Sequence, residues 1–186
     1  LIGKLEDKLV ERKKEESSTY PKFDSYDKNL VLSELLDNID FVGGYSLHGS
    51  RFTASGGENS EASLVFYRKG EPFLIASSER IAINNNKVMA SGTSVKIVLK
   101  NDSIIHPGLD LRYDPSESVL DLIRDGKGIS AAPYQNTYHD LEMDFQTLKW
   151  RMDKDEIVFG TMPGNTATPA NFESADYYTN NRFDMM

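Results

Sequence analysis

The residue types that most often carry chemistry are few in this chain and stand far apart. The sequence contains no cysteine, and its three histidines are His48, His106 and His139. Without cysteine there are no thiolate nucleophiles, disulfides or cysteine-based zinc sites. No two histidines have the H-E-x-x-H or H-x-H spacing that brings two imidazoles to one metal ion. We therefore expect each histidine to lie in a turn or at a strand edge.

Motifs for nucleophilic catalysis and for phosphate binding are also missing from the sequence. No serine stands in the G-x-S-x-G elbow that exposes the nucleophile of an α/β-hydrolase. The glycine pairs at 43–44 and 56–57 are not followed by the lysine and helix of a phosphate-binding loop. The sequence therefore predicts a protein that is not an enzyme and that needs no cofactor.

Two carboxylates form the best candidate for a metal or sugar site. Glu142 and Asp144 alternate with Met143 and Phe145, so both side chains are expected on the same polar face of a strand. A pair of carboxylates on one face can hold Ca²⁺ or line a sugar site. The alternative is an outward face that water solvates, and the pattern alone favours that alternative.

Aromatic residues provide a second candidate binding surface. Tyr134, Tyr138 and Trp150 lie within seventeen residues of one another, together with Phe145. Exposed flat rings stack on glycans or peptides, whereas buried rings fill a core. Both interpretations fit the alternating pattern, and measured accessibility distinguishes them.

The overall charge disfavours nucleic acids and anionic membranes as partners. The 186 residues include 21 basic and 29 acidic side chains, which gives a net charge of −8 at pH 7. Binding to phosphate backbones needs clustered Lys and Arg, and the one dense basic run, Arg12-Lys13-Lys14, has acids on both sides. No stretch approaches the roughly 20 apolar residues of a membrane-spanning helix.

The first 40 residues have a helical pattern. Leu1, Leu5 and Leu9 recur every four residues among charged residues, which predicts a helix over residues 1–17. Asn29 has the character of an N-cap, and the leucines that follow it predict a second short helix over residues 29–38. We expect these two helices to form a preamble that precedes the main domain and covers one edge of it.

From residue 41 the apolar period changes from helical spacing to two. Leu109, Leu111 and Tyr113 alternate with polar residues, as in a strand with one buried face. Turn signals recur at 69–72, 84–86, 91–92 and 107–108, so short strands follow one another about every ten residues. This spacing leaves no room for crossover helices, and the strands must be antiparallel.

The predicted fold class is mainly β, an antiparallel jelly roll or open β-solenoid with an N-terminal helical preamble. The sequence divides into a helical preamble and linker at residues 1–40, a β domain at residues 41–160, and a linker with a truncated C-terminal segment at residues 161–186. Because the chain starts at Leu1 without a methionine, we expect it to be part of a longer protein.

Residues 44–184 resemble segments of very large envelope proteins of the Bacteroidota. The strings that carry this resemblance are Gly44-Tyr45-Ser46-Leu47-His48-Gly49, Phe66-Tyr67-Arg68-Lys69-Gly70-Glu71-Pro72-Phe73, Asp102-Ser103-Ile104-Ile105-His106-Pro107-Gly108 and Phe172-Glu173-Ser174-Ala175. More distantly, residues 76–121 are similar to the OstA-type repeats of lipopolysaccharide-transport proteins. That second resemblance implies an envelope protein in which short strands stack into an open β jelly roll with an apolar groove.

These observations together lead to an expected function. We expect a non-catalytic structural or interaction module of a larger bacterial envelope protein, in the periplasm or associated with the outer membrane. Its expected partners are other segments of the parent protein or other envelope proteins, with glycan or lipid as further ligands. One alternative is a carrier of apolar ligands such as lipid in an open β groove, and another is a carbohydrate-binding module that uses Tyr134, Tyr138 or Trp150.

Overall fold

The computed structural model describes residues 2–8, 19–57, 60–84, 86–154, 156–162 and 170–174. These residues form one hydrogen-bonded sheet of 16 strands in which every pairing is antiparallel. The mainly β, antiparallel class that the sequence predicts is confirmed.

Three long strands bend and belong to two layers of this sheet. They are β4 (Ile39–His48), β9 (Lys87–Leu99) and β10 (Asp102–Asp114). The first part of β9 pairs with β8, through Ala90 and Ile81, whereas its second part pairs with β7, through Ile97 and Leu74. A bent strand of this kind joins two sheets at a corner.

Layer A is the set of strands on one side of these bends. It holds the first parts of β4 and β10, the second part of β9, and β3 (Leu30–Leu36), β6 (Ala62–Arg68), β7 (Glu71–Ser78), β12 (Tyr134–Asn136), β13 (Leu141–Asp144) and β16 (Asn171–Ser174).

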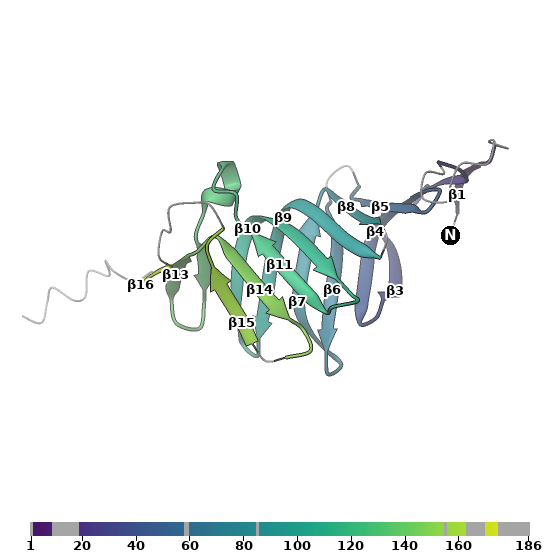
Figure 1. Cartoon of the computed structure of the whole chain (residues 1–186). Helices are drawn as coiled ribbons and strands as arrows, with labels where there is room; N and C mark the ends of the chain where they lie inside the picture. Colours follow the sequence, from purple (N-terminus) through teal and green to yellow (C-terminus); the bar gives the residue numbers. More distant parts are fainter. Residues whose placement is uncertain are drawn as a thin grey trace, which may run out of the picture.

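Layer B is the set of strands on the other side. It holds the remaining parts of β4, β9 and β10, together with β1 (Gly3–Glu6), β2 (Lys22–Ser25), β5 (Arg51–Ser55), β8 (Arg80–Asn84), β11 (Val119–Ile123), β14 (Thr147–Arg151) and β15 (Glu156–Gly160). Figure 1 shows β11, β14 and β15 as the nearer layer, with paler strands behind them.

The apolar core lies between the two layers. The ring of Phe66 on β6 meets Tyr113 on β10 at 5.3 Å between centroids, and Phe73 on β7 meets Trp150 on β14 at 5.0 Å. Neither contact joins strands that are hydrogen-bonded to each other, so both cross the space between the layers. Burying one face of each layer against the other is how antiparallel sheets with alternating sequences are stabilised.

Glycine and proline make the bends. Gly92 has a φ of +60° inside β9, a backbone conformation that glycine adopts without steric cost. The β10–β9 register shifts between His106 and Leu109, around Pro107-Gly108. The sequence signals at 91–92 and 107–108 were predicted to be turns between separate strands, and that prediction is wrong: each is a bulge at which a single long strand changes layer.

The predicted N-terminal helical preamble is not found. Residues 29–38, predicted as a short helix, form β3 and the turn after it, because Val31 and Leu32 pair with Val42 and Phe41 of β4. Long-range pairing with a strong neighbouring strand overrides the local helical spacing of the leucines. In the first predicted helix, Gly3–Glu6 is a strand, and residues 9–18 lie outside the described residues.

A hairpin turn was predicted at residues 69–72, and a turn is found there, but it is shorter: Lys69 and Gly70 form it, with φ values of +53° and +83°, and β7 already begins at Glu71. No helix in the described part of the chain is long and apolar enough to cross a membrane.

Candidate functional site

The three aromatic candidates do not share a surface. Tyr134 is 1% exposed and Trp150 is 6% exposed, so both belong to the core, whereas Tyr138 is 64% exposed. The Trp150 indole donates a hydrogen bond from Nε1 to the Lys154 carbonyl at 3.2 Å. Of these three rings, only Tyr138 presents a face to solvent, in the turn between β12 and β13.

The two carboxylate candidates lie on one exposed face of β13, as the alternation predicts. The Asp144 carboxylate forms an ion pair with the Arg124 guanidinium. Glu142 stands opposite Gln135 on β12 and Glu173 on β16. No group of three or more His, Cys, Asp or Glu side chains with the geometry to hold a metal ion occurs among the described residues.

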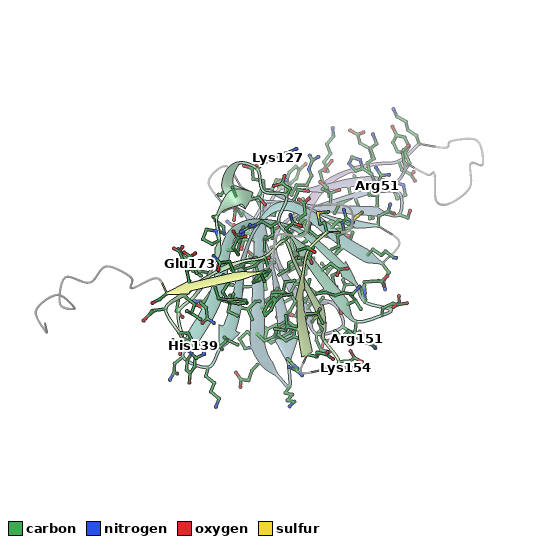
Figure 2. The ribbon with its side chains drawn as sticks, turned by 60° about the vertical axis from the view of Figure 1, so that its left-hand side comes forward. Arg51, Lys127, His139, Arg151, Lys154 and Glu173 are labelled. Atoms are coloured by element: carbon green, nitrogen blue, oxygen red, sulfur yellow. The ribbon has the colours of Figure 1, made fainter. Side chains whose placement is uncertain are left out.

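The histidines do not converge. His48 ends β4 beside a turn, and His139 lies in the β12–β13 turn with its ring against Tyr138 at 4.4 Å. Figure 2 shows His139 at the outer tip of its turn. His106, which was expected in a turn or at a strand edge, is instead 2% exposed within β10. It lies where that strand bends, so the expectation was wrong for this residue.

A buried polar cluster surrounds His106. Its Nε2 lies 2.8 Å from the Ala132 carbonyl, and the amide of Gly108 donates to its Nδ1 at 3.0 Å. Because Nδ1 accepts, Nε2 carries the proton and donates to Ala132. Arg124 donates to the same carbonyl from Nη1 at 3.2 Å. The bend of β10 is thus tied to the segment that enters β12.

The pKa values of His106 and Tyr134 in this cluster are shifted in the direction that favours the neutral form of each ring. Burial lowers the pKa of the His106 imidazole, and the nearby Arg124 charge lowers it further, although the hydrogen bond to Ala132 opposes both. Burial also raises the pKa of the Tyr134 phenol, and Arg124 opposes that shift. Both rings are therefore neutral near pH 7. The two rings are in contact at a tilt of 50°, with 4.6 Å between their centroids.

Three buried side-chain atoms lack a hydrogen-bond partner among the described residues. They are Thr93 Oγ1, Arg124 Nε and Tyr134 Oη. Tyr134 and Arg124 belong to the cluster around His106, and Thr93 stands opposite Leu109 just past the bend. Sequence reasoning missed this cluster, and the only signal for it was a histidine immediately before Pro107-Gly108.

The two ends of the sheet each carry edge strands with one described neighbour. At the end formed by the first strands, hereafter the first end, β1 pairs with β2 and β3 pairs with β4. At the end formed by the last strands, hereafter the last end, β15 pairs with β14 and β16 pairs with β13. Figure 1 shows β1 and β16 on opposite sides of the molecule.

Exposed apolar side chains gather on these edge strands. At the first end they are Leu5 at 66% and Val31 at 66%; at the last end they are Val158 at 53%, Phe159 at 38% and Phe172 at 49% exposure. Large apolar side chains that are exposed together mark surfaces that bind other proteins. An unpaired strand edge adds free backbone amides and carbonyls to the same surface.

The edges differ in how well they are protected against pairing. In β3 the register shifts between Leu32 and Leu36, and Glu34 there has a φ of +52°, so the second part of this edge is irregular. In β1, Lys4 and Glu6 form an ion pair at 2.6 Å. By contrast, β15 carries no charge after Glu156. It is the edge best suited to accept another strand.

The fold and its edges define an antiparallel β protein in which a double-layered sheet stacks along one direction. Comparison with known proteins adds no relative: no protein-family model, curated protein or solved structure matches this chain.

Proposed function

We propose that this chain is a non-catalytic interaction module of a larger bacterial envelope protein, and that it binds other β segments by strand addition at its ends. The single observation that carries the proposal is the edge of β15, which has β14 as its one described neighbour and carries the exposed Val158 and Phe159. In strand addition, backbone hydrogen bonds supply affinity and side-chain pockets supply specificity.

The stacked geometry makes other segments of the same kind suitable partners. We call each crossing of the chain over both layers a pass, for example β5 with β6 or β7 with β8. Each interior pass pairs with the pass before it and the pass after it. Strands supplied by another chain would therefore continue the same pattern. The expected partners are neighbouring segments of the parent protein or other envelope proteins. The resemblance to Bacteroidota envelope segments, and more distantly to OstA-type jelly-roll repeats, supports the same assignment.

A matched pair of variants tests the β15 edge, with a second copy of the chain as the probe. Val158 and Met89 lie in one cross-strand row on the outer face of layer B, but Val158 is on the edge and Met89, 46% exposed, is on the interior strand β9. Because a lysine on an edge strand opposes pairing, Val158→Lys should weaken self-association by about tenfold or more, which is roughly 1.4 kcal/mol.

Sedimentation velocity over a range of protein concentrations measures this association. Met89→Lys adds the same charge on the same face and should leave association unchanged. Equal effects of the two substitutions would contradict an edge-specific mechanism. A wild-type chain that stays monomeric at every concentration, and that also fails to capture a synthetic strand peptide, would contradict the proposal as a whole.

Turnover by the purified chain would overturn the non-catalytic part. A panel of ester and glycoside substrates is suitable, since Glu142 and Asp144 are the only carboxylate pair singled out by the sequence. We expect no activity above background. Hydrolysis that disappears in Glu142→Ala would show that the module is an enzyme.

A second candidate, a carrier of apolar ligands, is favoured by one specific observation. A cleft of about 340 Å³ opens between the turns of the two layers; Phe73, Tyr113 and Met152 are apolar members of a lining that is otherwise mostly polar. Phe73 and Tyr113 also make ring contacts across the core, and a lipid chain would have to part these contacts to enter it. Native mass spectrometry of the protein after mild extraction tests this: bound lipid supports a carrier, and a bare polypeptide mass contradicts it.

A further inference from the structure

A groove on the outer face of layer A has the chemistry of a small-molecule site. It spans β7, β9, β10 and β12, has a volume of about 550 Å³, and is walled by the segment that leads into β12. That volume lies in the range of sites for small ligands, roughly 300–1,000 Å³. The groove is separate from the strand edges and from the cleft between the layers.

The floor of the groove is apolar. Ile75 and Ile105 are half-buried on the solvent-facing side of their strands, and Pro107 and Pro133 complete the surface. Half-buried isoleucines on an outer face are incompletely packed by the chain itself. An apolar ligand would remove this surface from water, and such burial favours binding.

Among the described residues that line the groove, Lys96 alone has a formally charged side chain. In the sheet register it stands between Ile75 and Ile105, and Gln135 follows Ile105 in the same row. Adjacent strands are about 4.8 Å apart, so the lysine stem lies along the isoleucines while its ammonium group reaches the solvent. The cation is thus placed over an apolar floor.

Lys96 also differs from the lysines on the opposite face. Lys87 pairs with Asp114 at 2.8 Å and Lys149 with Asp121 at 3.8 Å, both on layer B. Lys96 has no ion-pair partner in the part of the chain that the structure describes. An anionic ligand would therefore find an ammonium group that is not already neutralised by a carboxylate.

A hydroxyl group near Lys96 adds a second polar contact. Ser94 is two residues before Lys96 in β9 and so lies on the same face. Its hydroxyl makes one long hydrogen bond, 3.4 Å to the Ser77 carbonyl. The hydroxyl of Ser77 is already engaged with Ser63 at 2.8 Å. Ser94 is therefore the hydroxyl better able to turn toward a ligand.

The wall of the groove is held in place from behind. The Ala132 carbonyl, which borders the groove, accepts hydrogen bonds from His106 Nε2 and Arg124 Nη1. A site that is already formed loses less conformational entropy when a ligand binds. The buried polar cluster at the bend thus supports the wall of this groove.

We propose that this groove binds a small amphipathic anion, with one carboxylate or equivalent anionic group at Lys96 and Ser94 and an apolar body over Ile75, Ile105 and Pro133. A single cation suits a monoanion better than a polyphosphate. A cationic ligand would be repelled. A free fatty acid and another apolar carboxylate share this chemistry.

Three probes with the same alkyl chain test the charge requirement: decanoate and decyltrimethylammonium, each kept below its micelle-forming concentration, and decan-1-ol, kept below its solubility limit. Amide chemical shifts of the full chain report both affinity and location. Decanoate should bind most tightly and shift the amides of Ser94, Lys96 and Ile105. Equal binding of the three probes, shifts confined to another face, or no binding of decanoate would overturn the proposal.

Matched variants test the residues. Lys96→Gln removes the proposed cation and should weaken decanoate binding by about tenfold or more, since a charge-assisted contact is lost. Lys149→Gln removes an exposed lysine from the opposite face and should change binding less than about twofold. Equal effects of both substitutions would overturn the assignment. Because Lys96 and Lys149 are both exposed, neither change disturbs the core.

A third variant tests the apolar floor. Ile105→Thr keeps the β-branched shape that suits a strand but adds a hydroxyl. It should weaken decanoate and decan-1-ol by similar factors, whereas Lys96→Gln should affect decanoate alone. If Ile105→Thr leaves both affinities unchanged while the sheet stays folded, the alkyl chain lies elsewhere and the proposal fails. Self-association through β15 is independent of all three outcomes.

Discussion

At the scale of single residues, His106 is the side chain whose ionisation most directly opposes folding. In the neutral form, its Nε2 donates a hydrogen bond to the Ala132 carbonyl and its Nδ1 accepts one from the Gly108 amide. Protonation of Nδ1 would place a second N–H against the amide of Gly108. Burial already lowers the pKa of this imidazole, and Arg124 adds to the effect.

This predicts a loss of stability in mild acid. Above the unfolded-state pKa of about 6.5 histidine is neutral in both states. As the pH falls below that value, the unfolded chain takes up a proton that folded His106 resists, so the free energy of unfolding decreases until the lowered folded-state pKa is passed. Chemical denaturation at pH 7.5 and 5.5 measures the difference.

The control for this prediction is the exposed His139. His106→Gln should reduce the difference in the free energy of unfolding between the two pH values, and His139→Gln should preserve it. A stability that is independent of pH in the wild-type chain would contradict the placement of His106. Asp114 causes a separate loss of stability in stronger acid. Lys87 holds the pKa of the Asp114 carboxyl at about 2, so the stability that this ionised carboxyl contributes is lost only as the pH falls from roughly 4 toward that value.

Tyr134 gives a second prediction at this scale. Its hydroxyl is buried without a hydrogen-bond partner among the described residues, while its ring stacks on Phe145 at 4.3 Å. Tyr134→Phe should therefore change the free energy of unfolding by about 1 kcal/mol or less, in the stabilising direction. Tyr134→Ala should cost about 3–5 kcal/mol, because it empties the ring's volume. If Tyr134→Phe is destabilising by more than about 1 kcal/mol, the hydroxyl has a partner.

Sequence reasoning predicted which residue types were candidates but not which were exposed. Glu142 and Asp144 share a face as expected, since strand alternation is a local property. The burial of Tyr134 and Trp150 depends on strands far away in the sequence, such as β7, which contributes Phe73. The sequence also did not predict that Lys96 has no ion-pair partner among the described residues, because the residues beside it, Ile75 and Ile105, come from other strands of the sheet.

At the scale of the elements, the bends decide the fold. Gly92 and Pro107-Gly108 have the residue types of turns, and a turn and a bulge both use positive φ or a missing amide donor, so local sequence does not distinguish them. The run from Met143 to Met152 alternates with one shift, a pattern that predicts a single strand with a bulge, and this prediction is wrong. The run is two strands, β13 and β14, in different layers.

The bend of β10 gives a prediction by double mutation. A Cβ placed on Gly108 would lie 2.5 Å from Cγ2 of Ile129, in the 3₁₀ helix Gly128–Ala131. Gly108→Ala should therefore lower the free energy of unfolding by about 1–3 kcal/mol through overpacking. Adding Ile129→Ala should recover most of that loss, because the methyl group that clashes is removed.

The four proteins of this cycle, wild type, two single variants and the double variant, isolate the contact. Ile129 is 62% exposed, so Ile129→Ala alone should cost little. Additive effects of the two substitutions would contradict direct packing of Ile129 on the bend. In that case the bend would be held by the hydrogen bonds of His106 alone.

At the scale of the whole molecule, the described residues form a stack of passes. Because each pass pairs with its neighbours in both layers, interior passes have partners on both sides, whereas the first and last have a described partner on one side. The sequence predicted this regularity, since alternation and turn spacing repeat along it. It did not predict which strands lie at the ends, and it assigned the first end to helices.

The central claim is that the edge of β15 accepts another strand, and amide hydrogen exchange along this strand tests it most directly. In the monomer, edge amides without a partner exchange quickly. When the chain associates at high concentration or binds a strand peptide, new protection should appear at those amides between Ile157 and Phe159 that point away from β14, and Val158→Lys should reduce this protection at the same concentration. Association with unchanged exchange across β15 would contradict the account.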